Sequence, residues 1–268
     1  MRLRDSTVVI TGAGGGIGGA VARVFAQEGA ALVLADLGDT VDAAVAAVRA
    51  AGARAVAQRA DVLDSRDMEA LAARAIREFG RLDVLVTCAG LGTSGLLHEQ
   101  DEAAWTRVVD VNLNGTYRAI RAAVPRMIEG GAGRIVTIAS ILGRVGGFGY
   151  VTAYAASKHG VIGLTRALAA ELGSQGYPGI TVNAICPGYV RAGMGIAMQS
   201  TKAGPMSART SAAPSSAKTR ATAPPMPPPA PVMTTAASRS RTPELRRTGR
   251  RPRRDACRWP ESCRRPSV

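Results

Sequence analysis

The sequence lacks several features that would place it in a special class of protein. No apolar run approaches membrane-spanning length, and the first twelve residues contain neither the long apolar segment nor the small-residue cleavage site of a secretory signal. The four cysteines, Cys88, Cys186, Cys257 and Cys263, fit no metal-ligand spacing. We therefore expect a soluble, cytoplasmic protein with reduced thiols and no metal site.

Acidic residues and leucine become scarce toward the C-terminus, where basic residues and proline accumulate. Residues 201–268 carry 15 Lys and Arg against 3 Asp and Glu, a net charge of +12, whereas residues 1–200 carry 19 against 17, a net charge of +2. Twelve of the 15 prolines lie beyond residue 200, and Leu245 is the only leucine after residue 204. Such a segment buries too little apolar surface to offset its ordering entropy. We predict a folded domain over 1–198 and a disordered tail over 199–268.

A basic tail raises the question of a nucleic-acid partner or another acidic surface. Trp259 is the only aromatic residue beyond residue 200, and the tail contains no recognisable nucleic-acid-binding motif. A nucleic-acid partner is therefore disfavoured.

Short β-branched runs alternate with longer helical patterns up to residue 188. The strand-like runs are residues 8–11, 32–36, 53–62, 83–87, 134–140 and 180–188. The helical patterns between them are residues 20–28, 41–51, 66–79, 102–128 and 152–172. This alternation predicts an α/β fold with a doubly wound, Rossmann-like parallel sheet of six strands. Sheets of this kind bind ligands beyond the carboxyl ends of their strands.

A glycine-rich stretch, TGAGGGIG, joins the first strand-like run to the first helical pattern. Its glycines, from Gly12 to Gly18, let the backbone turn sharply and approach a diphosphate, while the following helix N-terminus offers unpaired N–H groups. Glycines also form ordinary turns, but the place between strand and helix favours the pyrophosphate of a dinucleotide.

Asp36 ends the second strand-like run, 24 residues after Gly12. A carboxylate at this place can accept hydrogen bonds from ribose hydroxyls and would repel a 2′-phosphate, and neither Leu37 nor Gly15 supplies a compensating cation. The sequence therefore favours NAD over NADP, with a solvated aspartate as the alternative. The pair Asp61–Val62 closes the third strand-like run, where it could flank an adenine.

Tyr154 and Lys158 are four residues apart in a helical pattern, so both side chains project from one face. An ammonium group beside a phenol stabilises the phenolate, which would lower the tyrosine pKa and make the residue a general acid or base. The same spacing also occurs on ordinary solvated helix faces, so the pair alone does not establish a catalytic site.

Eight motifs in order resemble the short-chain dehydrogenase/reductase family over about residues 6–194. They are TGAGGGIG, Asp36, the DV at 61–62, CAG at 88–90, VNLNG, IVTIAS, YAASK and NAICPG. The resemblance implies a Rossmann-like oxidoreductase that moves a hydride between a nicotinamide and a small alcohol or carbonyl substrate. Among family members, the chain looks most like 3-oxoacyl-carrier-protein reductases and 3-hydroxyacyl dehydrogenases.

The resemblance assigns roles to four catalytic residues. Tyr154 would exchange the proton with the substrate oxygen, Ser140 would hydrogen-bond that oxygen, and Lys158 would also hold the nicotinamide ribose. Asn112 would hold a water that continues the proton path. Outside the family context, Ser140 could be an ordinary strand-end hydroxyl, and Asn112 a helix residue bonded to backbone.

The family pattern also assigns cofactor contacts, with the turn at Pro187 and Gly188 lying against the nicotinamide carboxamide. The predicted cofactor-binding residues are Gly12, Gly16, Ile17, Gly18, Asp36, Asp61, Val62, Ala89, Gly90, Tyr154, Lys158, Pro187, Gly188 and Val190.

Two single residues depart from the family pattern. Cys88 replaces an asparagine amide that braces the central sheet in the family, so local stability is expected to suffer. Ala192 stands where the family often has a threonine that bonds the carboxamide.

The C-terminal third departs most, because the family's substrate-covering helices and seventh strand are not recognisable there. A shifted reading frame near residues 198–206 would produce an amino-acid composition rich in Arg, Pro and Ala like that of this segment. The alternative is a genuine disordered extension. The resemblance implies a homodimer through the helices 102–128 and 152–172, and loss of the tetramer-forming interface that the missing elements would build. The competing hypothesis is a nucleotide-binding protein that no longer turns over substrate.

Overall fold

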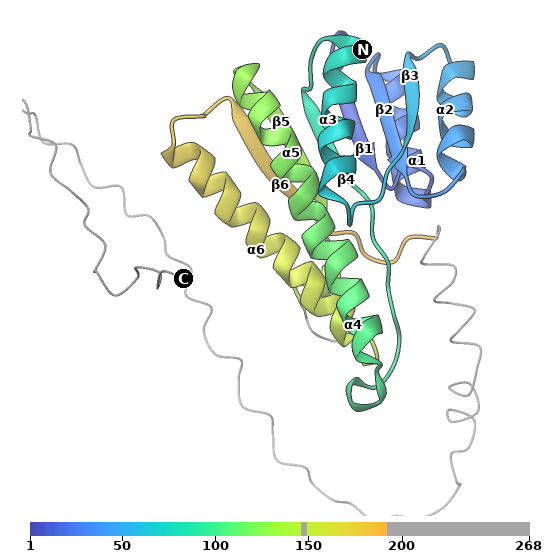
Figure 1. Ribbon diagram of the computed structural model, residues 1–268, viewed down its shortest axis with the longest axis vertical. Helices are drawn as coiled ribbons and strands as arrows, with labels where there is room; N and C mark the ends of the chain where they lie inside the picture. The colour runs from blue at the N-terminus through green and yellow to red at the C-terminus, as the bar shows by residue number, and fades with distance from the viewer. Residues whose placement is uncertain (146–148, 192–268) are drawn as a thin grey trace, which may run out of the picture. The chain divides into compact units, whose positions relative to one another are not determined.

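The computed structural model describes residues 1–145 and 149–191, which form a parallel sheet covered by helices on both faces (Figure 1). The strand order is β3-β2-β1-β4-β5-β6, and every pairing is parallel. The strands are β1 (Thr7–Thr11), β2 (Ala31–Asp36), β3 (Ala55–Arg59), β4 (Val84–Thr87), β5 (Gly133–Ile138) and β6 (Ile180–Ile185). The predicted doubly wound, Rossmann-like sheet is confirmed.

Six α-helices connect the strands. They are α1 (Gly16–Gln27), α2 (Thr40–Ala50), α3 (Ser65–Phe79), α4 (Glu102–Val109), α5 (Gly115–Glu129) and α6 (Thr152–Ser174). The first helix begins four residues earlier than its apolar pattern indicates, because its first turn is made of the glycines that follow β1. The other predicted helices keep their places, apart from the long one between β4 and β5.

Alternate residues of each strand point to opposite faces of the sheet and build two cores. On one face, Ile10 and Leu34 pack with α1 and α2. On the other face, Val9 and Leu85 pack with α3, α5 and the end of α6. The central strands β1, β2 and β4 are almost entirely buried, which explains their nearly continuous apolar sequences.

The predicted helix over 102–128 is interrupted at its centre. Between α4 and α5 the chain forms one π-helical turn, η2 (Asp110–Asn114), which contains Val111 and Asn112 as buried residues. Such a turn adds a residue to the helical repeat, so the residues before and after it face different directions. The interruption places an asparagine inside the protein.

The strand order reverses between β1 and β4, because β2 and β3 follow β1 on one side and β4, β5 and β6 on the other. Loops after these two strands leave in opposite directions, which opens a crevice at their carboxyl ends. The predicted tail over 199–268, the missing seventh strand and Ala192 lie outside the described residues.

Candidate active site

The turn after β1 depends on glycine at two positions. Gly12 has a φ of +68°, and a Cβ atom there would lie 2.5 Å from the backbone nitrogen of Ala89. A Cβ at Gly18 would collide with the carbonyl oxygen of Gly12. Both glycines thus allow the turn to pack between the end of β4 and the start of α1, with the N-terminal N–H groups of α1 beside it.

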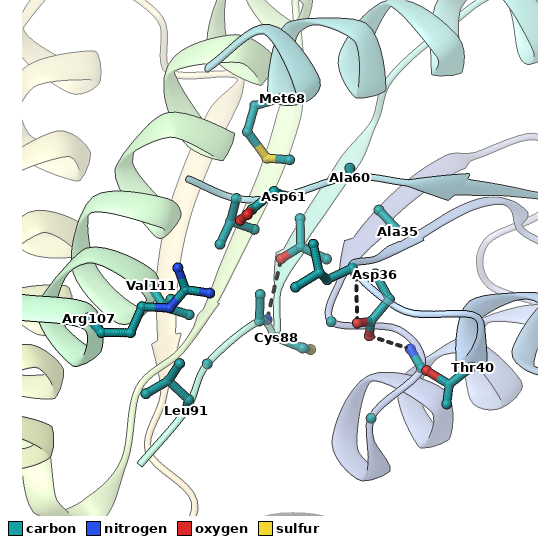
Figure 2. A pocket seen from close by; sticks show the side chains of 18 residues that line it. Ala35, Asp36, Thr40, Ala60, Asp61, Met68, Cys88, Leu91, Arg107 and Val111 are labelled. Carbon is teal, nitrogen blue, oxygen red and sulfur yellow. Dashed lines mark hydrogen bonds between the residues drawn. The ribbon is translucent and has the colours of Figure 1, made fainter. Parts of the chain in front are cut away.

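Asp36 ends β2 next to this turn. One of its carboxylate oxygens accepts a hydrogen bond from the Gly14 backbone nitrogen at 2.9 Å, and the other accepts one from Leu37 at 2.8 Å. Figure 2 shows both contacts at the edge of the cleft. Each carboxylate oxygen has a second lone pair, so Asp36 can accept further hydrogen bonds from a ligand.

A cleft of about 350 Å³ lies at the carboxyl ends of β1, β2, β3 and β4. The predicted cofactor residues that line it are Gly12, Asp36, Asp61, Val62, Ala89 and Gly90. The sequence analysis missed Arg107 of α4, which also lines the cleft. In Figure 2 its guanidinium group reaches toward the cleft from the side opposite Asp36. Arg107 lies four residues before the VNLNG motif but is not part of it, so no local pattern pointed to it.

The remaining predicted cofactor residues lie at the borders of this cleft or farther along the same sheet edge. Gly16 and Ile17 form the first turn of α1, together with Gly18. Pro187 follows β6, and its carbonyl oxygen accepts a hydrogen bond from the Ile141 backbone nitrogen at 2.9 Å. Next to it, Gly188 and Val190 are exposed. The turn after β6 thus lies beside the loop that follows β5.

Ser140 is the last residue before a short 3-10 helix, η3 (Ile141–Gly143), in the loop after β5. Its hydroxyl oxygen accepts a hydrogen bond from the Leu142 backbone nitrogen at 3.1 Å, which leaves the hydroxyl proton for another acceptor. Tyr154 of α6 is a neighbour of this hydroxyl, and a side-chain hydrogen bond with Ser140 acts to lower the pKa of the Tyr154 phenol.

Lys158 lies one helical turn after Tyr154 and is almost completely buried, with 5% of its surface exposed. Its Nζ donates a 2.8 Å hydrogen bond to the carbonyl oxygen of Ile138 and lies 5.6 Å from the centre of the Tyr154 ring. The predicted placement of both side chains on one helix face is correct. They meet the Ser140 loop at the end of β5.

Burial controls the pKa values of this pair. It raises the pKa of Tyr154 more than the hydrogen bond from Ser140 lowers it. Burial also lowers the pKa of Lys158 to about 8, against a smaller opposing effect of Cys88. The structure gives Tyr154 a raised pKa rather than the lowered one expected from a neighbouring lysine, because desolvation by burial is the largest effect on the phenol.

Asn112 is completely buried, and both polar atoms of its side-chain amide are hydrogen-bonded. Its Oδ1 accepts from the Leu91 backbone nitrogen at 2.8 Å, and its Nδ2 donates to the Leu91 carbonyl oxygen at 2.9 Å and to Ser157 Oγ at 3.0 Å. A Cβ at Gly90 would lie 3.1 Å from Asn112 Oδ1 and 3.5 Å from Lys158 Nζ. The amide thus joins the loop after β4 to α6 beside the lysine.

Cys88 lies at the end of β4 and lines the cleft. It is a free cysteine, and burial raises the pKa of its thiol to about 12, so the group stays neutral. Its backbone nitrogen donates to the Thr11 carbonyl oxygen at 3.0 Å, which extends the pairing of β4 with β1. The backbone pairing of β4 with β1 thus continues as far as Cys88.

Within residues 1–145 and 149–191, no group of His, Cys, Asp or Glu is arranged to hold a metal ion. In the same part of the chain, no helix is long and apolar enough to cross a membrane.

A glycine turn against a helix N-terminus, an acidic residue ending β2, and a cleft at the strand-order reversal together define a dinucleotide-binding Rossmann-type protein. Residues 6–203 match the family model for short chain dehydrogenases. The chain belongs to this family of nicotinamide-dependent oxidoreductases, as its sequence predicts.

Known relatives support the assignment. The chain is 44% identical over 186 residues to a cis-4-hydroxycyclohexanecarboxylate dehydrogenase of Sinomonas cyclohexanicum, covering 69% of this chain and 73% of the relative. It is 38% identical over 192 residues to a 3-oxoacyl-[acyl-carrier-protein] reductase of Staphylococcus aureus, covering 71% and 76%. The chain is also similar to the crystal structure of an actinorhodin polyketide ketoreductase variant with NADPH. The sequence identity is 37% and the TM-score 0.71, and the match covers 76% of this chain and 78% of the ketoreductase.

Proposed function

We propose that the protein is an NAD-dependent oxidoreductase that interconverts a secondary alcohol and a ketone. The observation that carries this proposal is the cluster of Ser140, Tyr154 and Lys158 at the same sheet edge as a cleft bordered by Asp36. This arrangement combines groups that can exchange a proton with groups that can hold a dinucleotide.

The residues present fit a dinucleotide. The turn at Gly12 leaves room where a side chain would collide with the chain, and the cleft offers a carboxylate at one side and a guanidinium at the other. We propose that Gly12, Gly16, Ile17 and Gly18 hold the diphosphate and Asp36 the adenosine ribose. Asp61 and Val62 would hold the adenine, and Ala89, Gly90, Pro187, Gly188, Val190, Tyr154 and Lys158 the nicotinamide half. When bound, the nicotinamide supplies or accepts the hydride.

Four residues of the chain would handle the proton. Tyr154 gives its phenolic proton to the ketone oxygen during reduction and takes it back during oxidation. The Ser140 hydroxyl turns from the phenol to the substrate oxygen, and the Lys158 ammonium group stabilises the phenolate as it forms. Asn112 holds the loop after β4 against α6, next to the lysine. In this proposal it would also hold a water that continues the proton path.

The preference for NAD over NADP rests on Asp36. A 2′-phosphate placed against this carboxylate would meet like charge in a partly buried site. The ketoreductase relative crystallised with NADPH leaves the alternative cofactor open to a direct test.

For the substrate, we propose a 3-oxoacyl compound or a cyclic, polyketide-like ketone. Support comes from relatives whose names specify a 3-oxoacyl reductase, a polyketide ketoreductase and a cyclohexanecarboxylate dehydrogenase. The cytoplasm is the proposed compartment, because the described cysteines Cys88 and Cys186 are both free.

Steady-state kinetics with NADH and NADPH test the proposal, using a 3-oxoacyl thioester and a substituted cyclohexanone. We expect kcat/KM to favour NADH by about tenfold or more, which corresponds to one repulsive contact of roughly 1–2 kcal/mol. The variant D36N keeps an oxygen acceptor but removes the charge, so its preference should move toward NADPH. A wild-type preference for NADPH contradicts the cofactor assignment. NADH binding without reduction of either ketone supports the competing, catalytically impaired alternative.

A further inference from the structure

Ser157 lies on α6 between Tyr154 and Lys158 and is hydrogen-bonded to Asn112 of the π-helical turn, and the motifs assign it no role. It is 1% exposed. Its hydroxyl donates a 2.7 Å hydrogen bond to the carbonyl oxygen of Tyr154 and accepts a 3.0 Å bond from Nδ2 of Asn112. A serine hydroxyl has one proton to donate, and this one is used locally, so its lone pair is directed to the asparagine.

The bond from Asn112 to Ser157 crosses between elements that are otherwise in apolar contact. A Cβ at Gly160 would lie 2.8 Å from Leu113, so α6 and η2 approach closely here. A Cβ at Gly143 would lie 2.6 Å from the carbonyl oxygen of Lys158, so the loop after Ser140 also packs closely against α6. Close packing of this kind sets how near α6 lies to η2 and to the Ser140 loop. A hydrogen bond also restricts their relative orientation, because its strength depends on the donor–acceptor angle.

We propose that Ser157 is a positioning residue, whose hydroxyl holds Asn112 and the helix carrying Tyr154 and Lys158 in their working arrangement. The inference rests on the proposed oxidoreductase function. Without the hydroxyl, one N–H of a fully buried amide has no acceptor, and the amide must turn or admit water. Either change loosens the contact of Asn112 with Leu91 and alters the surroundings of the neighbouring lysine.

The variant S157A tests this proposal, with T165V as the matched control. Thr165 is also buried on α6, and its hydroxyl also bonds the preceding helical turn, at Val161, and a second element, at Thr137. It lies two turns beyond the catalytic residues. Both variants remove one buried hydroxyl from the same helix, so both should lower the unfolding midpoint to a similar extent.

Only S157A should change the chemistry. We expect kcat for ketone reduction to fall by about tenfold or more, the effect of leaving one buried N–H unpaired, with KM and NADH affinity within about threefold of wild type. T165V should keep the wild-type kcat. S157T retains the hydroxyl and should recover most of the activity if its extra methyl group is accommodated.

A second measurement does not depend on turnover. The chain contains three lysines, Lys158, Lys202 and Lys218, so the side-chain amine of Lys158 can be followed by NMR after lysine labelling and assigned with K158M. The ionisable groups near it are the Tyr154 phenol and the Cys88 thiol. Water admitted by S157A should raise the pKa of Lys158, while T165V should leave it unchanged.

The two readouts separate failure of this inference from failure of the proposed function. Wild-type kcat and an unchanged lysine titration in S157A overturn the positioning role. Equal losses of kcat in S157A and T165V overturn it as well, because they indicate a purely structural effect. If the wild type reduces no ketone, the proposed function fails, and the lysine titration still decides the role of Ser157.

Discussion

At the scale of single residues, the environment of Lys158 departs strongly from that in water. Burial lowers its pKa to about 8, although the carbonyl oxygen of Ile138 accepts a hydrogen bond from it. We predict that the NMR signal of this lysine titrates near pH 8, while lysines exposed to solvent titrate near their ordinary pKa of about 10.4. A titration above pH 10 contradicts the burial described here.

The sign of the effect on stability follows from this shift. The unfolded lysine keeps its ordinary pKa, so above pH 8 the native state releases a proton that the unfolded state still binds. Stability from this group therefore rises with pH between about 8 and 10. Comparing wild type with K158M by urea unfolding isolates this contribution, because the thiol and phenol nearby are present in both. For ketone reduction, the loss of the ammonium charge should lower kcat/KM above pH 8.

At position 12, both the backbone conformation and the packing exclude any residue that carries a Cβ atom. We predict that G12A weakens NADH binding by at least about tenfold and lowers the unfolding midpoint, because the new Cβ meets the Ala89 backbone and the positive φ costs about 1 kcal/mol. Fluorescence titration and thermal unfolding measure the two effects. G173A is the control, since a Cβ at Gly173 meets nothing within 4 Å. Unchanged NADH affinity in G12A removes this turn from the cofactor site.

The sequence indicated candidate site residues where they belong to a local motif, but not the burial and hydrogen-bond partners of their side chains. Gly12, Asp36 and Tyr154 were found because each belongs to a local pattern at a strand end or on a helix face. Arg107 and Ser157 were missed, because their contacts come from elements that are distant in the sequence.

At the scale of elements, the π-helical turn decides the position of Asn112. Periodicity indicated one helix over 102–128, and the chain does remain helical throughout. A single added residue at η2 is invisible to a pattern search, because α4 and α5 each keep their own apolar face. Gly115 follows the turn, and a Cβ there would lie 2.7 Å from Val62, so α5 begins in close contact with a residue that lines the cleft.

Pro125 offers a prediction about α5 itself. It lies inside the helix, and its side chain is exposed. Because proline has no backbone N–H, the helix lacks the hydrogen bond that residue 125 would donate to the carbonyl oxygen of Arg121. P125A should stabilise the protein by about 2 kcal/mol, the helical cost of proline less its restriction of the unfolded chain. A rise of the unfolding midpoint by a few degrees checks this. P125G restores the N–H but not helix propensity, so it should gain less; a lower midpoint for P125A contradicts the argument.

At the scale of the whole molecule, we predict a homodimer through the exposed faces of α5 and α6. Tyr117 of α5 is 49% exposed, and a Cβ at Gly163 of α6 meets nothing within 4 Å. Both features fit helices that pack against a second copy. Light scattering should give twice the chain mass of 27.6 kDa.

The variant G163R places a long charged side chain on this face and should yield monomers that still bind NADH. The control G173R alters a different face of the same helix and should remain dimeric. A wild-type monomer, or a dimeric G163R, contradicts the proposed interface. The predicted loss of the tetramer concerns elements outside the described residues and stays a prediction.

Backbone periodicity and short motifs are local properties, so the amino-acid sequence alone predicts the order of strands and helices, the glycine turn, the acidic end of β2 and the Tyr154–Lys158 pair. The burial of Lys158 against Ile138, 20 residues away, and the contact of Asn112 with Ser157, 45 residues away, follow only from the folded arrangement. The physical reason is that pKa values and hydrogen-bond partners depend on desolvation by residues that only folding brings together.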